Sequence, residues 1–133
     1  ATNEDIVVAA REANILDAIE MLPDGFNTYV GDNSSAKLPA SLVHGICLAR
    51  AYIRNAPILL LDEPAESLDM LSDSRLIKQL SDRKGKQTII MVSHRPSHIK
   101  LADRVMVISE GMVKGIGTPQ EVLQALYGVK QGE

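Results

Sequence analysis

Two adjacent carboxylates, Asp62 and Glu63, end an unbroken aliphatic run over residues 58–61. A short continuous apolar run is typical of a strand buried on both faces, as in a parallel sheet. Pro64 cannot donate to a strand ladder and therefore predicts the end of the strand. Open α/β sheets bind ligands at the carboxyl ends of their strands, which makes the two acids candidate ligand-binding residues. The alternative is a buried strand that ends in solvated acids.

A histidine follows the second apolar run of the chain. Residues 87–92 predict another buried strand, and Ser93-His94-Arg95-Pro96 comes directly after it. A lone histidine at a strand end is more often structural than functional. The position of His94, one strand after Asp62 and Glu63, favours a functional role.

The remaining patterns predict the elements that position these residues. Together they indicate an α/β fold, with a mainly parallel sheet, flanking helices and a C-terminal β-hairpin. Apolar periodicity and caps predict helices over residues 3–13, 14–22 and 39–54, with Pro39 at a first helical position. A further helix is capped by Ser72 or Asp73, and the last runs from a capping box at Thr118 to about Tyr127. The predicted hairpin joins residues 104–108 and 112–116 through Glu110-Gly111.

Size and composition exclude several classes of protein. A chain of 133 residues is long enough for one small domain. The net charge of −3, the 3% aromatic content and the absence of Trp give no case for nucleic acid, which we exclude as a partner. We expect no transmembrane helix, because no apolar run approaches 20 residues, and no signal peptide at the acidic start. Cys47 is the only cysteine, which fits a cytosolic setting without disulfides.

Several of these motifs resemble one family. Leu59-Leu60-Leu61-Asp62-Glu63-Pro64, followed by Ser67-Leu68-Asp69, resembles the Walker B motif and D-loop of ATP-binding-cassette (ABC) ATPases. Ser93-His94-Arg95 resembles the switch-histidine loop of that family. The tract Leu-Pro-Asp-Gly-Phe-Asn-Thr over residues 22–28 looks like the helical subdomain of its exporter-type members. No G-x-x-x-x-G-K-[ST] motif occurs in the chain, so we interpret it as the C-terminal half of such a nucleotide-binding domain.

The resemblance implies a role for each motif residue in a complete domain. Asp62 would hold Mg²⁺, Glu63 would act as the general base for the attacking water, and His94 would contact the γ-phosphate of ATP. Ser67, Leu68 and Asp69 would contact the partner subunit.

The segment from Leu38 to Leu42 stands in the register of the family's signature motif, Leu-Ser-Gly-Gly-Gln, whose residues bind the nucleotide on the partner subunit. Pro39 has neither a hydroxyl nor an N–H, and Ala40 adds a Cβ where close approach to phosphate is needed. The preceding loop, from Gly31 to Leu38, is one residue longer than the family norm. We therefore expect a degenerate signature in which only the leucine is kept. Its five residues are Leu38, Pro39, Ala40, Ser41 and Leu42.

The resemblance divides the chain into residues 1–54, part of the helical subdomain with the degenerate signature, and residues 55–133, part of the RecA-like catalytic subdomain. It implies a subunit that couples ATP binding and hydrolysis to export at the cytoplasmic face of a membrane. Its partners would be a second nucleotide-binding domain and a transmembrane domain. The alternative is a degenerate, non-catalytic subunit whose role is to dock against a partner.

Two expectations concern the chain by itself. A sheet without its usual neighbours should expose apolar surface and promote self-association. Without the phosphate cradle of the P-loop, the 133-residue chain should neither bind ATP tightly nor hydrolyse it. Titration calorimetry with Mg-ATP tests the second expectation, which saturable binding at micromolar ligand would contradict.

Overall fold

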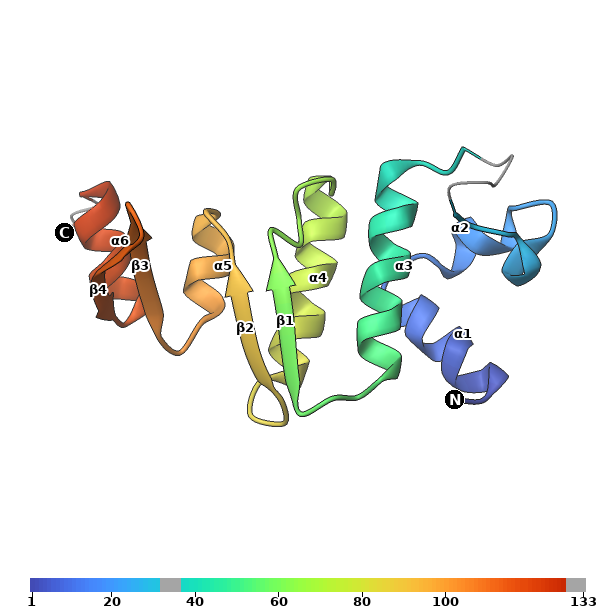
Figure 1. Cartoon of the computed structure of the whole chain (residues 1–133), viewed down its shortest axis with the longest axis horizontal. Helices are drawn as coiled ribbons and strands as arrows, with labels where there is room; N and C mark the ends of the chain where they lie inside the picture. Colours follow the sequence, from blue (N-terminus) through green and yellow to red (C-terminus); the bar gives the residue numbers. More distant parts are fainter. Residues whose placement is uncertain (32–36, 129–133) are drawn as a thin grey trace. The chain divides into compact units, whose positions relative to one another are not determined.

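The computed structural model of the chain describes residues 1–31 and 37–128, which form both helices and strands, as predicted for an α/β fold (Figure 1). The chain forms two compact units, Ala1–Met91 and Val92–Glu133. The first unit begins with α1 (Asn3–Glu12), α2 (Leu16–Glu20), the 3₁₀ helix η1 (Gly25–Asn27) and α3 (Ala40–Ile53). It continues with β1 (Ile58–Asp62) and α4 (Met70–Arg83), and the division falls at the end of β2 (Thr88–Val92). The second unit holds α5 (Pro96–Leu101), β3 (Val105–Ser109), β4 (Met112–Gly117) and α6 (Pro119–Tyr127). Within the described residues, none of the helices has the length and apolar character needed to cross a membrane.

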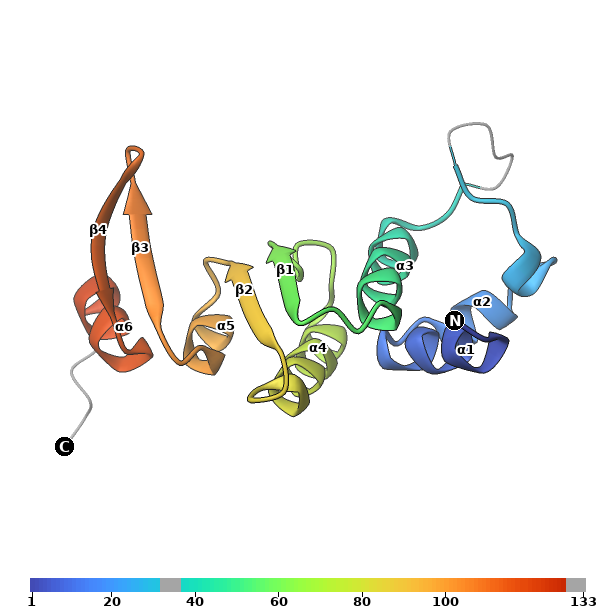
Figure 2. The ribbon, with the colours of Figure 1, turned by 60° about the horizontal axis from the view of Figure 1, so that its bottom comes forward.

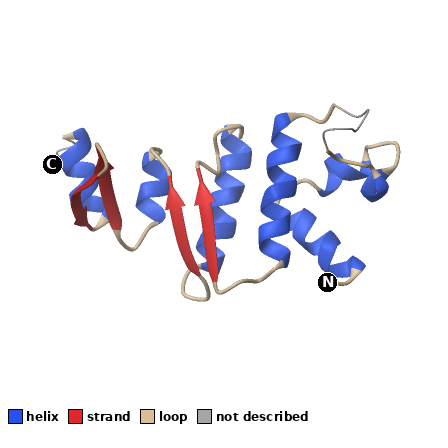
Figure 3. Cartoon of the chain, viewed as in Figure 1, coloured by secondary structure: helices blue, strands red, loops and turns tan. Residues whose placement is uncertain are grey.

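The strands β1 and β2 form a hydrogen-bonded pair, and their arrows point the same way, as expected for a parallel sheet (Figure 3). Alternate side chains of β1 differ sharply in exposure. Leu59 and Leu61 are buried, whereas Ile58 and Leu60 are 54% and 69% exposed. Burial of β1 on both faces was therefore a wrong prediction. Burial of β2 was also a wrong prediction, since Ile90 and Val92 are 56% and 59% exposed. Because successive strand side chains point to opposite faces, the described residues cover one face of β1 and leave the other open.

The open face of β1 should make the chain self-associate, because a contiguous apolar surface favours burial between molecules. We expect Leu60→Lys to shift the chain toward monomer by placing a charge in that face. Val43→Lys is the matched control, since Val43 is an exposed aliphatic residue on α3. Light scattering over a dilution series measures the effect. A parent chain that stays a monodisperse monomer at high concentration would contradict this prediction.

The N-terminal helices α1 and α2 lie beside α3 (Figure 2). The buried side chains of Ala10, Ile15, Ile19 and Leu42 form a small apolar cluster between them. Gly45 allows this close packing, because a Cβ built there would lie 2.1 Å from the Ile15 Cγ2 atom. The helix α2 is shorter than the predicted 14–22. Asn14 adopts a left-handed φ of 59°, which interrupts the helical path between α1 and α2.

A second contact joins α1 and α3 to the end of α4. Arg83 forms an ion pair with Glu12, and its guanidinium lies 4.2 Å from the centre of the Tyr52 ring. Burial raises the pKa of Tyr52 to about 12; the neighbouring Arg83 opposes this rise and Glu12 adds to it. The Tyr52 hydroxyl is therefore neutral at physiological pH. An arginine held by a carboxylate and an aromatic face thus connects three helices of the first unit.

The second unit contains the predicted hairpin. The antiparallel strands β3 and β4 pair from Val105 with Gly117 to Ser109 with Met112. Glu110 and Gly111 both have positive φ, 52° and 71°, as a two-residue type I′ turn requires. The helix α6 begins with the predicted capping box, in which Thr118 and Glu121 bond each other's backbone N–H. The short helix α5 was not predicted.

Candidate functional site

Asp62 and Glu63 lie where β1 turns sharply into the following loop. Asp62 is exposed and Glu63 is half-buried. Glu63 has a left-handed φ of 41°, an uncommon conformation for a residue with a side chain. The Glu66 N–H then donates to the Glu63 carbonyl at 3.1 Å. Such outliers concentrate at functional sites, where the surrounding structure holds them. The predicted position of both acids at a strand's carboxyl end is confirmed.

A histidine on α3 supports this turn. His44 donates its Nε2 hydrogen to the Pro64 carbonyl, with 2.5 Å between the two heavy atoms. The bond joins the helix after the predicted signature segment to the residue directly after Glu63. Sequence reasoning missed this contact, because no motif or spacing relates two residues that lie 20 positions apart.

Asp69 caps the N-terminus of α4. The Ser72 N–H donates to the Asp69 Oδ1 atom at 2.7 Å, and this bond lowers the pKa of the Asp69 carboxyl below 3.8. The prediction that Ser72 or Asp73 caps the helix was wrong. Asp69 has the extended backbone of an N-cap and stands three residues before the N–H that it accepts, while Asp73 is buried inside the helix.

The cap makes the stability of the chain depend on pH in a predictable direction. Because the folded-state pKa of Asp69 lies below its unfolded value, the stabilisation is fully present above 3.8 and is lost as pH falls through the folded value. Asp69→Asn keeps an acceptor oxygen without the titration, whereas Asp69→Ala removes the cap. We expect the parent chain to lose more stability on acidification than the Asn variant, measured as urea midpoints at neutral pH and well below 3.8. Equal losses would contradict the prediction.

The predicted signature segment leads into α3 as expected, but Pro39 is the N-cap and not the first helical residue. Its ψ of 143° is extended, and its carbonyl accepts from the Leu42 and Val43 N–H groups at 3.0 and 3.1 Å. Leu42 is 5% exposed within the apolar cluster, and Leu38 packs against that cluster. Two of the five segment residues are therefore engaged in the core. Most of the loop predicted to be one residue too long, residues 32–36, lies outside the described residues.

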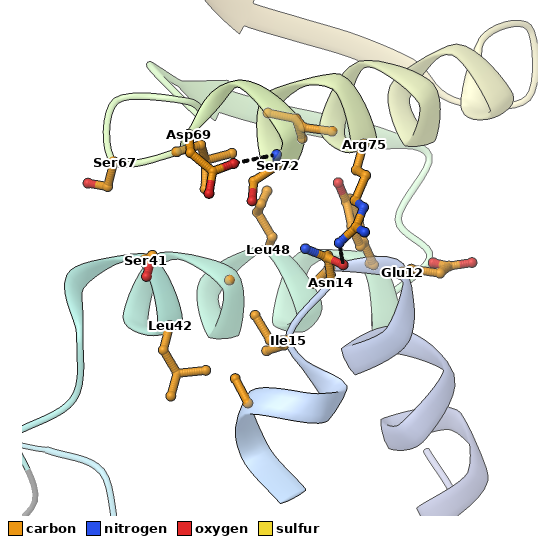
Figure 4. A pocket seen from close by; sticks show the side chains of 16 residues that line it. Glu12, Asn14, Ile15, Ser41, Leu42, Leu48, Ser67, Asp69, Ser72 and Arg75 are labelled. Carbon is orange, nitrogen blue, oxygen red and sulfur yellow. Dashed lines mark hydrogen bonds between the residues drawn. The ribbon is translucent and has the colours of Figure 1, made fainter. Parts of the chain in front are cut away.

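A pocket of about 280 Å³ brings the two predicted partner-contact segments together (Figure 4). Ser41 and Leu42 on α3 line it with Ser67, Leu68 and Asp69 from the loop before α4. Arg75 donates to the Asn14 Oδ1 atom at the same pocket. The other predicted site residues of the first unit do not line it. They are Leu38, Pro39, Ala40, Asp62 and Glu63.

His94 belongs to the second unit, on the loop between β2 and α5. Its side chain is exposed, and its carbonyl accepts from the Tyr127 hydroxyl at 3.4 Å. The loop therefore presents the ring at a surface while its backbone contacts α6.

The donor set at the end of β1 fits Mg²⁺ in company with phosphate. Within residues 1–31 and 37–128, no three His, Cys, Asp or Glu side chains gather closely enough to hold an ion by themselves. Mg²⁺ does not need such a group, since it is commonly bound by one or two carboxylates together with water and substrate phosphates. The exposed Asp62 carboxylate, beside Glu63, supplies that kind of ligand.

Comparison with known proteins connects these residues to a family. No protein-family model matches the chain. The chain is 36% identical over 130 residues to an ATP-dependent lipid A-core flippase of Haemophilus influenzae strain 86-028NP, which covers 98% of this chain and 22% of the flippase. It is 42% identical over 123 residues to the ABC multidrug transporter MDR1 of Cryptococcus neoformans var. grubii, covering 92% of this chain and 9% of that protein.

The fold agrees with the sequence comparison. A bacterial Atm1-family ABC exporter, solved with ATP bound, superposes with a TM-score of 0.84 and 28% identity, over 100% of this chain and 25% of that one. The chain thus spans about a fifth of the length of the flippase relatives. Sequence and fold together show that this chain is homologous to part of full-length ABC exporters.

Proposed function

We propose that this chain is part of an ABC exporter subunit that binds and hydrolyses ATP to drive export, at the cytoplasmic face of a membrane. One observation carries the proposal. The Asp62-Glu63 pair stands on a tight turn at the carboxyl end of a strand, in a chain that matches a flippase over 98% of its length. Ligands of open α/β sheets bind at such strand ends.

In this proposal, Glu63 is the general base that polarises the attacking water. Glu63 is the less exposed residue of the pair and directly follows Asp62, the proposed Mg²⁺ ligand, so its carboxylate is the candidate that accepts a proton from water. Asp62 would hold Mg²⁺, which when bound neutralises phosphate charge. His94 would contact the γ-phosphate. The predicted division into a helical part (1–54) and a catalytic part (55–133) belongs to the same proposal.

The partners would be a transmembrane domain and a second nucleotide-binding domain. The pocket shared by Ser41, Leu42, Ser67, Leu68 and Asp69 supports a common surface for the second domain, since both partner-contact segments line it. A non-catalytic, docking subunit is the second candidate. It is favoured by Pro39, which offers no N–H at the start of α3, and by the burial of Leu42.

A chimera tests the proposal. The 130 residues of the Haemophilus influenzae flippase that match this chain are replaced by the chain, and the ATPase rate of the purified protein is measured. We expect ATP hydrolysis above that of a chimera carrying Asp62→Asn and Glu63→Gln together. A folded chimera that binds ATP without hydrolysing it would instead support the docking subunit.

A further inference from the structure

The loop that carries His94 is closed by the hydroxyl of the preceding residue. The Arg95 N–H donates to the Ser93 Oγ atom at 3.2 Å, so the residues on either side of His94 are joined to each other. A serine hydroxyl that bonds the backbone N–H two residues on is a common device for fixing a tight turn. His94 is the residue enclosed by this turn.

The same hydroxyl is anchored to a buried side chain. A hydrogen bond of 2.9 Å joins Ser93 Oγ and the Nδ1 atom of His98. His98 lies on α5 with 0% exposure, and its backbone N–H donates to the Arg95 carbonyl at 3.0 Å. A ring enclosed on all sides cannot change rotamer easily, so it offers the hydroxyl a fixed partner. His98 and Ser93 thus hold the His94 loop through two bonds that meet at one oxygen atom.

We propose that Ser93 and His98 are positioning residues, which hold the His94 ring where it meets the phosphate of the nucleotide. This inference rests on the proposed function, in which His94 contacts the γ-phosphate. The third contact, from the Tyr127 hydroxyl to the His94 carbonyl, is longer at 3.4 Å and exposed, so it adds little to the order of the loop. The hydroxyl–imidazole bond is part-buried, so water competes with it less than with the exposed Tyr127 contact.

The chain itself gives a direct readout, the hydrogen exchange of the Arg95 amide. His98→Phe keeps an aromatic ring of similar size but removes Nδ1, and leaves the Ser93 hydroxyl in place. We expect Arg95 exchange to accelerate roughly three- to tenfold, the equivalent of one ordinary hydrogen bond. His98→Asn places an amide at the position of Nδ1 and should restore slow exchange. A histidine that serves only as packing would give the opposite order, with Phe better than Asn.

Three further variants keep the test independent of how His98→Phe folds. Ser93→Ala removes the shared oxygen from a half-buried position, and Ser93→Thr retains it. Val122→Ala, at a buried position of α6, is the control that lowers the stability of the second unit while it keeps both Ser93 and His98. Of these three variants, only Ser93→Ala should accelerate the hydrogen exchange of the Arg95 amide. Equal hydrogen exchange of the Arg95 amide in Ser93→Ala and Ser93→Thr would overturn the proposal that Ser93 and His98 hold the His94 loop.

The flippase chimera supplies the catalytic readout. Misplacing a group by about 1 Å can cost about a hundredfold in rate, so we expect His98→Phe and Ser93→Ala to lower kcat by about ten- to hundredfold with the KM for ATP little changed. His98→Asn and Ser93→Thr should recover most of the loss. An active chimera whose kcat is unaffected by His98→Phe would overturn the positioning role. A chimera without any hydrolysis would instead overturn the proposed function. Hydrogen exchange of the Arg95 amide alone would then decide whether Ser93 and His98 hold the His94 loop.

Discussion

Glu63→Gln should lower the ATPase rate of the flippase chimera by about 10²–10⁴-fold and leave ATP binding intact. Glutamine keeps the size of the side chain and its hydrogen-bonding capacity, but it cannot accept a proton from water. The left-handed φ of 41° at this position belongs to the backbone, so the substitution should not alter the turn. The rate of a single turnover, measured with enzyme in excess, reports the chemical step directly.

The neighbouring acids provide the controls. Glu66→Gln changes an exposed carboxylate of the same loop and should leave the rate unchanged, since that side chain has no part in the proposed chemistry. Asp62→Asn should raise the Mg²⁺ concentration needed for half-maximal activity. If Glu63→Gln hydrolysed ATP near the parent rate, Glu63 would not be the base, and His94 would become the leading candidate.

Local sequence signals predicted the elements well where one short segment contains the whole cause. The capping box at Thr118 and Glu121 and the Glu110-Gly111 turn each hold their partners within three residues. The strand before Asp62 was found for the same reason, because an aliphatic run and a proline define it. The aliphatic run did not indicate how many faces of the strand are buried. Leu60 is exposed, and the covering of a strand face depends on how other elements pack on it, which the run itself does not encode.

Long-range contacts account for most of what was missed. The bond from His44 to Pro64 and the ion pair of Arg83 with Glu12 join residues 20 and 71 positions apart, and residues of these types occur on any surface. Nothing in their local sequence distinguishes them until the fold brings them together. The cap at Asp69 was a different kind of error. Three polar residues compete there within five positions, and the backbone conformation of Asp69 decides among them.

Restoring the signature segment should raise the ATPase rate at the partner's site by at least about tenfold. This is a conservative value, since a single preorganised hydrogen-bond donor typically contributes about 10²–10³ to the rate. The full restoration is Pro39→Ser, Ala40→Gly, Ser41→Gly and Leu42→Gln. Pro39→Ser supplies a hydroxyl and an N–H at the start of α3, and the glycines let phosphate approach the backbone closely. The effect falls on the partner's site because, in the proposed arrangement, each site takes its signature from the other subunit.

The structure changes how this experiment should be designed. Leu42 is 5% exposed in the cluster with Ala10, Ile15 and Ile19, so glutamine there would bury an amide among apolar side chains. We therefore expect the triple variant, with Leu42 retained, to be more stable than the quadruple variant, by urea denaturation, and at least as active. Val43→Gln is the matched control, since it adds the same amide on an exposed position of α3.

The ATPase rate is compared in two pairs of subunits. In both pairs one subunit carries the restored segment; the other subunit is unrestored and has either Glu63 or Glu63→Gln. The ATPase rate should rise when the unrestored subunit has Glu63, because the restored segment completes the ATP site that lies on the unrestored subunit. This rise should vanish when that subunit carries Glu63→Gln. An equal rate with and without restoration would show that Pro39 and its neighbours do not limit hydrolysis. The length of the loop between Gly31 and Leu38 would then be the next feature to change.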